Sequence, residues 1–183
     1  MKSSQFKAVG IGECLWDDFP SGRQPGGAPA NFAYIAGQLG DRGIIASRVG
    51  DDADGRELVQ QLERRGIDSS RIQIDDSHHT GIVSVELDGG QPRYVITENV
   101  AWDNLEMSSE WRSMAAECDA VCFGSLAQRT ESSRKAIKEF VSLTPKSAKR
   151  VFDANLRQSY YSEAVLIDSL RLANIVKLNE DEL

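Results

Sequence analysis

The chain has 183 residues and a formal net charge of −7, with 40% hydrophobic and 27% charged residues. This length and composition are typical of one soluble globular domain with a sizeable core. The acidic balance, with a sequence pI of about 4.9, argues against nucleic acid or an anionic membrane surface as a partner, because both attract clustered Lys and Arg.

The N-terminal stretch has no long apolar segment, so we expect no signal peptide. No stretch approaches the roughly 20 apolar residues that a membrane span needs. The cysteines Cys14, Cys118 and Cys122 form no disulfide framework and indicate a reducing, cytoplasmic setting. Cys118 and Cys122 flank a strand-like run, which favours buried thiols over a metal pair.

The first half of the chain begins with alternating strands and helices. Residues 6–12 are an apolar run that predicts a buried strand, followed by a loop rich in Pro and Gly. Residues 26–40 predict a glycine loop that leads into a helix. Residues 42–50 then predict a second strand, and residues 52–66 an amphipathic helix that ends at a glycine.

This alternation stops between about residues 71 and 97. Three β runs follow one another there without a helix, at residues 71–75, 80–88 and 91–98. Asp88, Gly89 and Gly90 supply a hairpin turn between the second and third runs. We therefore expect an antiparallel segment that stands off the main sheet.

The alternation then resumes and predicts an α/β fold. The expected helices are residues 108–116, 130–144 and 162–172, and the expected strands are 119–125, 149–155 and 174–179. Such a rhythm indicates a mainly parallel sheet with helices on its faces and right-handed crossovers. The last residues, EDEL, read as the first turn of a further helix, where a complete domain is not expected to end.

The stretch GGAPAN combines a close backbone approach with a helix start. Gly26 and Gly27 let a ligand approach the main chain, and Pro29 suits a first helical turn. Free N–H groups at a helix start bind hydroxyls or anions, and Asn31 offers both a donor and an acceptor. The alternative is an ordinary helix entry whose small residues pack closely on the sheet, which local physics favours.

Polar and charged side chains follow two of the predicted strands. They lie at the carboxyl edge of the expected sheet, where ligands of parallel sheets usually bind. Asp17 comes after the first strand and has the acceptors to bind sugar hydroxyls; the alternative is a solvated loop acid. The sequence DANLR brings Asp153, Asn155 and Arg157 to the end of a later strand. The Arg157 guanidinium suits a phosphate or carboxylate, and the alternative is a surface ion pair.

Asn179 and Glu182 follow the last predicted strand. Their oxygens suit hydrated Mg²⁺, whereas the alternative, helix capping by Asn179, is favoured by the motif alone. His78 and His79 lie in a polar stretch and read as loop residues. The dinucleotide fingerprint is incomplete, because Leu15 replaces its third glycine, and no GxxxxGK[ST] motif occurs in the sequence.

Taken in order, these segments resemble the PfkB, or ribokinase-like, carbohydrate kinases. The stretch GGAPANFAYIAGQLGDRGIIASRVG is similar to the family's first signature. GECLWDDFP, NVAWD, DANLR and KLNEDEL are similar to other family segments, in the family's order. The fructokinase-like branch is the most similar.

The resemblance implies a ribokinase-like three-layer αβα sandwich with a small antiparallel β-lid at about residues 71–97. It implies that Asp17, Gly26, Gly27 and Asn31 hold a sugar. The lid, which carries Arg93 and Tyr94, would cover the sugar and pair with a second subunit to form a homodimer. Arg157 would face the sugar or its phosphate, and Asn179 and Glu182 would be associated with Mg²⁺ and phosphate. The implied reaction is transfer of the ATP γ-phosphoryl group to a sugar hydroxyl.

The sequence departs from the family in one respect. The family's catalytic base and anion hole belong to a GAGD-type motif, and no GAGD occurs in these 183 residues. We therefore expect one domain that lacks the C-terminal part of the fold, with no catalytic residue of its own. The alternative to a kinase is a fragment that binds sugar or dimerises without turnover; an oxidoreductase is poorly supported because its glycine fingerprint fails.

Overall fold

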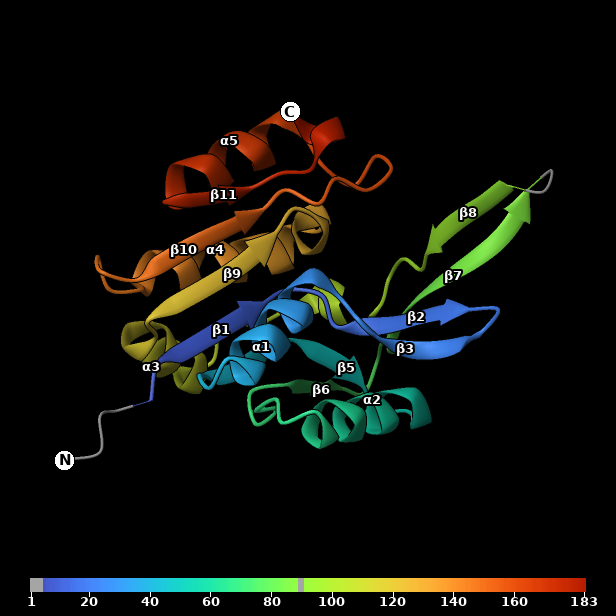
Figure 1. The fold of residues 1–183 in the computed structure, drawn as a ribbon, viewed down its shortest axis with the longest axis horizontal. Helices are drawn as coiled ribbons and strands as arrows, with labels where there is room; N and C mark the ends of the chain where they lie inside the picture. Colours follow the sequence, from blue (N-terminus) through green and yellow to red (C-terminus); the bar gives the residue numbers. More distant parts are fainter. Residues whose placement is uncertain (1–4, 89–90) are drawn as a thin grey trace.

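The computed structural model describes residues 5–88 and 91–183, with only the backbone described between residues 85 and 93. Its largest sheet is parallel, with strand order β11-β10-β9-β1-β4 (Figure 1). These strands are β1 (Lys7–Ile11), β4 (Arg42–Ala46), β9 (Ala120–Gly124), β10 (Lys149–Asp153) and β11 (Ile175–Lys177). The predicted α/β class with a mainly parallel sheet is confirmed.

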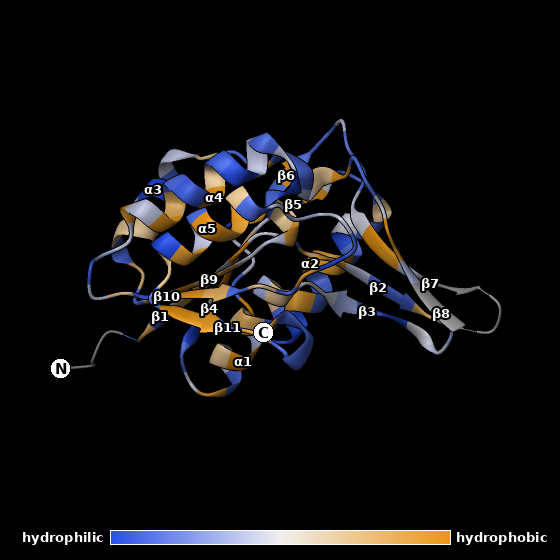
Figure 2. Ribbon diagram, turned by 90° about the horizontal axis from the view of Figure 1, so that it is seen from above, coloured by the Kyte–Doolittle hydropathy of each residue, from blue (hydrophilic) through white to orange (hydrophobic). Residues whose placement is uncertain are grey.

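Helices cover both faces of this sheet, which gives three layers (Figure 2). One face packs against α3 (Ser109–Glu117), α4 (Glu131–Leu143) and α5 (Glu163–Leu172). The side chains of Ser108 and Ser162 accept hydrogen bonds from the first turns of α3 and α5, so both helices have the caps that serine favours. The core on this side contains large buried rings, those of Trp111, Phe123, Phe140 and Phe152.

The other face of the sheet packs against α1 (Ala28–Gln38). A Cβ at Gly10 would lie 2.0 Å from the carbonyl oxygen of Pro29, and one at Gly43 would lie 1.9 Å from that of Ala33. The helix backbone therefore rests directly on the strands. Close packing of the helix on the sheet therefore requires glycine at these two strand positions.

A second sheet stands off the main body and forms the lid (Figure 1). Its strand order is β3-β2-β7-β8, from β2 (Leu15–Phe19), β3 (Gly22–Gly26), β7 (Gly81–Asp88) and β8 (Gln91–Ile96). The β2–β3 and β7–β8 pairs are antiparallel, as expected for β7 and β8, but β2 and β7 are parallel. The predicted turn residues Gly89 and Gly90 lie outside the described residues.

Two expectations about this region are wrong. The stretch read as a loop after β1 forms the hairpin of β2 and β3; Pro25 is tolerated because β3 is an edge strand. The first run of the expected lid is β6 (Gln73–Asp75), which pairs in parallel with β5 (Arg48–Gly50) in a separate small sheet. Of the segment at residues 71–97, only β7 and β8 therefore belong to the lid. The lid sheet also includes β2 and β3, which precede α1 in the chain.

The remaining elements join these layers. Helix α2 (Ala53–Arg64) begins at Asp52, whose side chain accepts a hydrogen bond from the backbone N–H of Gly55. The expected strand at residues 42–50 is split into β4 and β5, and Ser47 between them donates to the carbonyl of Gly12. Short 3₁₀ turns are η1 (Ala101–Asn104), η2 (Leu126–Arg129) and η3 (Glu180–Glu182). Within the described ranges, no helix has both the length and the apolar character that a membrane span requires.

Candidate sugar site

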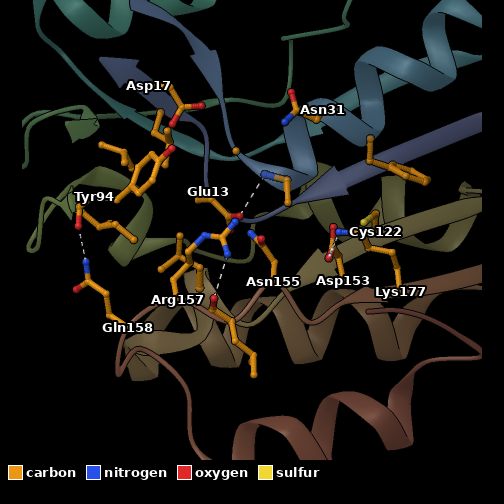
Figure 3. Close-up of a pocket in the computed structure, with 18 of the residues that line it drawn as sticks. Glu13, Asp17, Asn31, Tyr94, Cys122, Asp153, Asn155, Arg157, Gln158 and Lys177 are labelled. Atoms are coloured by element: carbon orange, nitrogen blue, oxygen red, sulfur yellow. Dashed lines mark hydrogen bonds and ion pairs between the residues drawn. The ribbon is translucent and has the colours of Figure 1, made fainter. Parts of the chain in front are cut away.

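A large cavity lies between the lid and the carboxyl ends of the parallel strands (Figure 3). Its volume is about 1210 Å³, above the 300–1,000 Å³ range that is usual for small-molecule sites. Five of the predicted residues line it together: Asp17, Gly27, Asn31, Tyr94 and Arg157. Residues that lie up to 140 positions apart in the chain thus meet at one cavity, at the sheet edge where ligands of parallel sheets bind.

The first turn of α1 forms one wall of the cavity. Gly27 precedes the helix with φ of 107°, a conformation that favours glycine, and a Cβ there would lie 2.4 Å from the carbonyl oxygen of Glu13. The backbone N–H of Asn31 donates to the carbonyl of Gly27 at 3.0 Å, which starts the helix. The carboxamide of Asn31 remains at the cavity wall, where it can both donate to and accept from a ligand.

Asp17 faces this wall from strand β2 of the lid. Gly26, which does not itself line the cavity, leaves space for it: a Cβ at Gly26 would lie 2.1 Å from Oδ2 of Asp17. Burial raises the pKa of Asp17, and the nearby Arg157 guanidinium opposes that rise. Tyr94 joins the cavity from β8 with 52% of its surface exposed. The side chain of Arg93 lies outside the described part of β8.

The loop after β10 forms the opposite side of the cavity. Asn155 turns the chain with φ of 40°, a conformation that asparagine tolerates better than most residues. Arg157 donates to the neighbouring carbonyl of Leu156 at 3.0 Å, and its position leaves it available to a ligand. Asp153 pairs with Lys177 at 3.1 Å at the far end of the cavity (Figure 3).

Asn179 and Glu182 do not line the cavity among the described residues. The Asn179 side chain accepts hydrogen bonds from the backbone N–H groups of Asp181 and Glu182, so the capping alternative describes what Asn179 does. Glu182 accepts from the backbone N–H of Leu156 at 2.7 Å and from that of Asn179 at 3.0 Å. Glu182 therefore anchors the loop that carries Arg157, and Asn179 caps the turn that holds Glu182.

Sequence reasoning missed Glu13, which lines the cavity and is 1% exposed. Its only sequence signal is a single charge between Gly12 and Cys14, at the end of an apolar strand. Lys177 and Gln158 also line the cavity and were not predicted. Since Lys and Glu are most often exposed, composition alone gives no reason to place them in a site.

The lid is fastened to the loop after β10 by hydrogen bonds from Gln158 and Tyr160, of which the longest joins the Tyr160 hydroxyl to the carbonyl of Ile96 at 3.5 Å. Gln158 donates to the carbonyl of Tyr94 at 2.8 Å, and the Tyr160 hydroxyl donates to Glu98 at 2.6 Å. The hydrogen bond to the Glu98 carboxylate raises the pKa of Tyr160. These hydrogen bonds join the loop to residues 94–98, the end of β8 and the turn after it, which we call the lid base. The lid base and the loop therefore form one wall of the cavity.

We expect Tyr160→Phe to loosen the lid base, because it removes the hydrogen bond to Glu98. The expected cost is about 1 kcal/mol, since Glu98 is exposed to solvent, and amide exchange at the end of β8 should become about fivefold faster. Hydrogen exchange read by mass spectrometry measures this. Tyr161→Phe is the matched control, and equal exchange in both variants would show that the Tyr160 hydroxyl does not hold the lid.

Comparison with known proteins gives the family. The model of the pfkB family carbohydrate kinases matches residues 21–183. This chain belongs to the PfkB family. A putative sugar kinase from Pyrococcus horikoshii is 34% identical over 87% of this chain and 54% of its own length. A fructokinase from Salmonella typhimurium is 32% identical over 87% of this chain, again covering 54% of the relative.

Solved structures of PfkB-like sugar kinases share the fold. The crystal structure of the Pyrococcus horikoshii sugar kinase in complex with ATP has a TM-score of 0.84 at 31% identity, covering 97% of this chain and 64% of that one. A fructokinase from Vibrio cholerae bound to fructose, ADP and calcium has a TM-score of 0.80 at 25% identity, covering 98% and 62%. The chain thus spans about half the length of the curated relatives.

Proposed function

We propose that this chain supplies the sugar-binding part of a PfkB-type kinase that transfers the γ-phosphoryl group of ATP to a hydroxyl of fructose or a similar sugar. The observation that carries the proposal is the convergence of Asp17, Asn31 and Arg157 on one cavity beside a helix start. A carboxylate, a carboxamide and free backbone N–H groups are the partners that several hydroxyls of one small molecule require.

Each lining residue has a proposed role. Asp17 accepts hydrogen bonds from two hydroxyls, and Gly27 and Asn31 hold the sugar from the helix side. Gly26 keeps the space that the Asp17 carboxylate occupies. Tyr94 covers the sugar from the lid, and Arg157 neutralises charge on the transferred phosphoryl group. Phosphoryl transfer depends on such positioning and on charge neutralisation.

ATP and Mg²⁺ are the proposed cofactors. Asn179 fits poorly as a direct metal ligand, because its side-chain oxygen already accepts two backbone N–H groups. Glu182 is half-buried, and each of its carboxylate oxygens accepts one backbone N–H and keeps a lone pair that can bind hydrated Mg²⁺ through water.

Two further points belong to this proposal. Pairing of the lid with a second copy would give a homodimer, and the exposed ring of Tyr94 on β8 supports that surface. The three buried free thiols are consistent with the cytoplasm. The alternative function is sugar binding or dimerisation without turnover, and the absence of a GAGD sequence from this chain favours it for the chain on its own.

Calorimetric titration of the 183-residue chain with fructose tests the proposal. We expect binding without ATP-dependent phosphorylation, and we expect Asp17→Asn to weaken binding by about 10- to 100-fold, because hydrogen bonds to a charged group contribute about 1.5–3 kcal/mol. Asp18→Asn is the matched control, since Asp18 is the exposed neighbour on the same strand. Equal affinity of both variants would remove Asp17 from the site, and no binding of any sugar would overturn the proposal.

A further inference from the structure

Glu13 is a buried carboxyl group at the junction of three elements. It follows β1, its side chain faces the first turn of α1, and Asp153 at the end of β10 lies near enough to influence its charge. The backbone N–H of Ala28 donates to Oε1 of Glu13 at 3.3 Å. Its other oxygen, Oε2, is buried and has no hydrogen-bond partner within the described part of the chain. A buried oxygen without a partner disfavours the ionised form.

The first turn of α1 rests on Glu13. Gly27 packs against the Glu13 backbone, where a Cβ would lie 2.4 Å from its carbonyl oxygen, and Ala28 is bonded to its side chain. Asn31 is bonded through its backbone to Gly27. Gly27, Ala28 and Asn31 all line the cavity together with Glu13, and Figure 3 shows Asn31 and Glu13 at its wall. A change at the Glu13 carboxyl is therefore transmitted to the cavity wall.

The charged and titratable groups that face Glu13 favour its neutral form. Burial raises the pKa of Glu13 to about 7, and the negative charge of Asp153 adds to that rise. Cys14 and Cys122 are buried beside it, and burial raises the pKa of each thiol, so both remain neutral. Two cations line the same cavity, and within the described part of the chain neither forms an ion pair with Glu13: Lys177 pairs with Asp153, and Arg157 donates to the carbonyl of Leu156. The carboxyl therefore exchanges its proton near neutral pH.

We propose that Glu13 is a positioning residue for the sugar, that it acts through Ala28 and the first turn of α1, and that it takes up a proton when the cavity is filled. This inference rests on the proposed function. The proton comes from solvent and adds to the Glu13 carboxylate, and no bond of the sugar changes. A bound ligand displaces water from the cavity, and that loss of solvent makes a charge on the neighbouring carboxyl less favourable.

The test is calorimetric titration of fructose into the wild-type chain at pH 7, in two buffers whose ionisation enthalpies differ. We expect uptake of a fraction of a proton per sugar. We also expect the affinity to fall between pH 6 and pH 8.5, by up to about tenfold if binding shifts the pKa by one unit. Glu13→Gln keeps the size of the side chain and an acceptor for Ala28, and it should abolish both effects. Glu13→Ala removes the acceptor and should weaken binding at every pH.

Three results would overturn the inference, and they separate it from the proposed function. Sugar binding by the wild type without proton uptake leaves the function standing and removes the role of Glu13. Equal uptake by Glu13→Gln and the wild type assigns the proton to another group, since that variant retains Asp17 and Asp153. No binding by the wild type overturns the function and the inference together.

Discussion

Replacing Arg129 with Met is expected to lower the free energy of unfolding by about 3–5 kcal/mol, because it leaves a buried carboxylate without its partner. Nε and Nη2 of Arg129 lie 2.7 Å from the two carboxylate oxygens of Asp103. The side chains of Arg129 and Asp103 are 6% and 4% exposed. Water can therefore not replace the lost contacts without opening the structure.

The same guanidinium joins several elements near the lid base. Nη2 also donates to the carbonyl of Thr97 at 2.7 Å, and the group lies 4.0 Å from the ring centre of Trp102 and 4.8 Å from that of Tyr160. Such stacking adds to the stability of a desolvated cation. The variant should therefore loosen the lid base as well as lower global stability.

Lys138→Met is the matched control for this prediction. Lys138 pairs with Asp168 at 2.7 Å, but the two side chains are 43% and 39% exposed, and exposed pairs contribute about 0–1 kcal/mol. Denaturant unfolding of both variants and the wild type measures the difference. A second variant, Arg129→Met with Asp103→Leu, should recover part of the loss, because it removes the unpaired charge. Similar losses in Arg129→Met and Lys138→Met would contradict the prediction.

Local patterns predicted the elements whose partners are near in the chain or whose ends carry clear signals. Helix α2 begins at the Asp52 cap and ends before a glycine, and α3 and α5 begin at serines, so their positions could be read directly. The buried strands β1 and β9 are short apolar runs between turn residues. Tertiary packing was not needed to find these elements.

The lid was predicted incompletely because its pairing joins segments that are distant in the chain. Leu15 in β2 pairs with Gly81 in β7, and nothing local in either segment indicates the other. The β3 segment GRQPG has the composition of a loop, and only its place at the sheet edge allows a strand with proline. In the same way, nothing local in β6 indicates its pairing with β5, and three β runs without a helix between them predict that it belongs to the lid.

The candidate site was predicted where polar residues follow strands, and missed where a charge is buried. Asp17, Asn31 and Arg157 were found through motif order and strand ends, and the structure brings them to one cavity. Asn179 and Glu182 were predicted with them, but in the described structure Glu182 holds the neighbouring loop and Asn179 caps the turn that carries Glu182. Glu13 was not predicted as a site residue, because glutamate side chains are usually exposed and this one is buried.

Stability should depend on pH through Glu13, and Glu13→Gln should remove that dependence. The pKa of Glu13 is raised from 4.5 to about 7 in the folded chain, chiefly because burial disfavours the charge. Between these two pH values the unfolded chain releases the proton and the folded chain keeps it. The contribution is therefore fully present below pH 4.5 and is lost as the pH rises through about 7. A shift of this size corresponds to at most about 3 kcal/mol.

Denaturant unfolding of the wild type and of Glu13→Gln between pH 4.5 and pH 8.5 measures this contribution. The wild type should lose stability relative to the variant across that range, so that the variant becomes the more stable protein above pH 7. Glu117→Gln provides a flat control, because the hydrogen bond from Lys7 lowers the pKa of the exposed Glu117, so its contribution changes chiefly as the pH falls below this range. A constant difference between the wild type and Glu13→Gln would show that the buried carboxyl does not change its charge in this range. In that case proton uptake at Glu13 on sugar binding would lose its physical basis, whereas the proposed sugar site, which rests on Asp17, Asn31 and Arg157, would be unaffected.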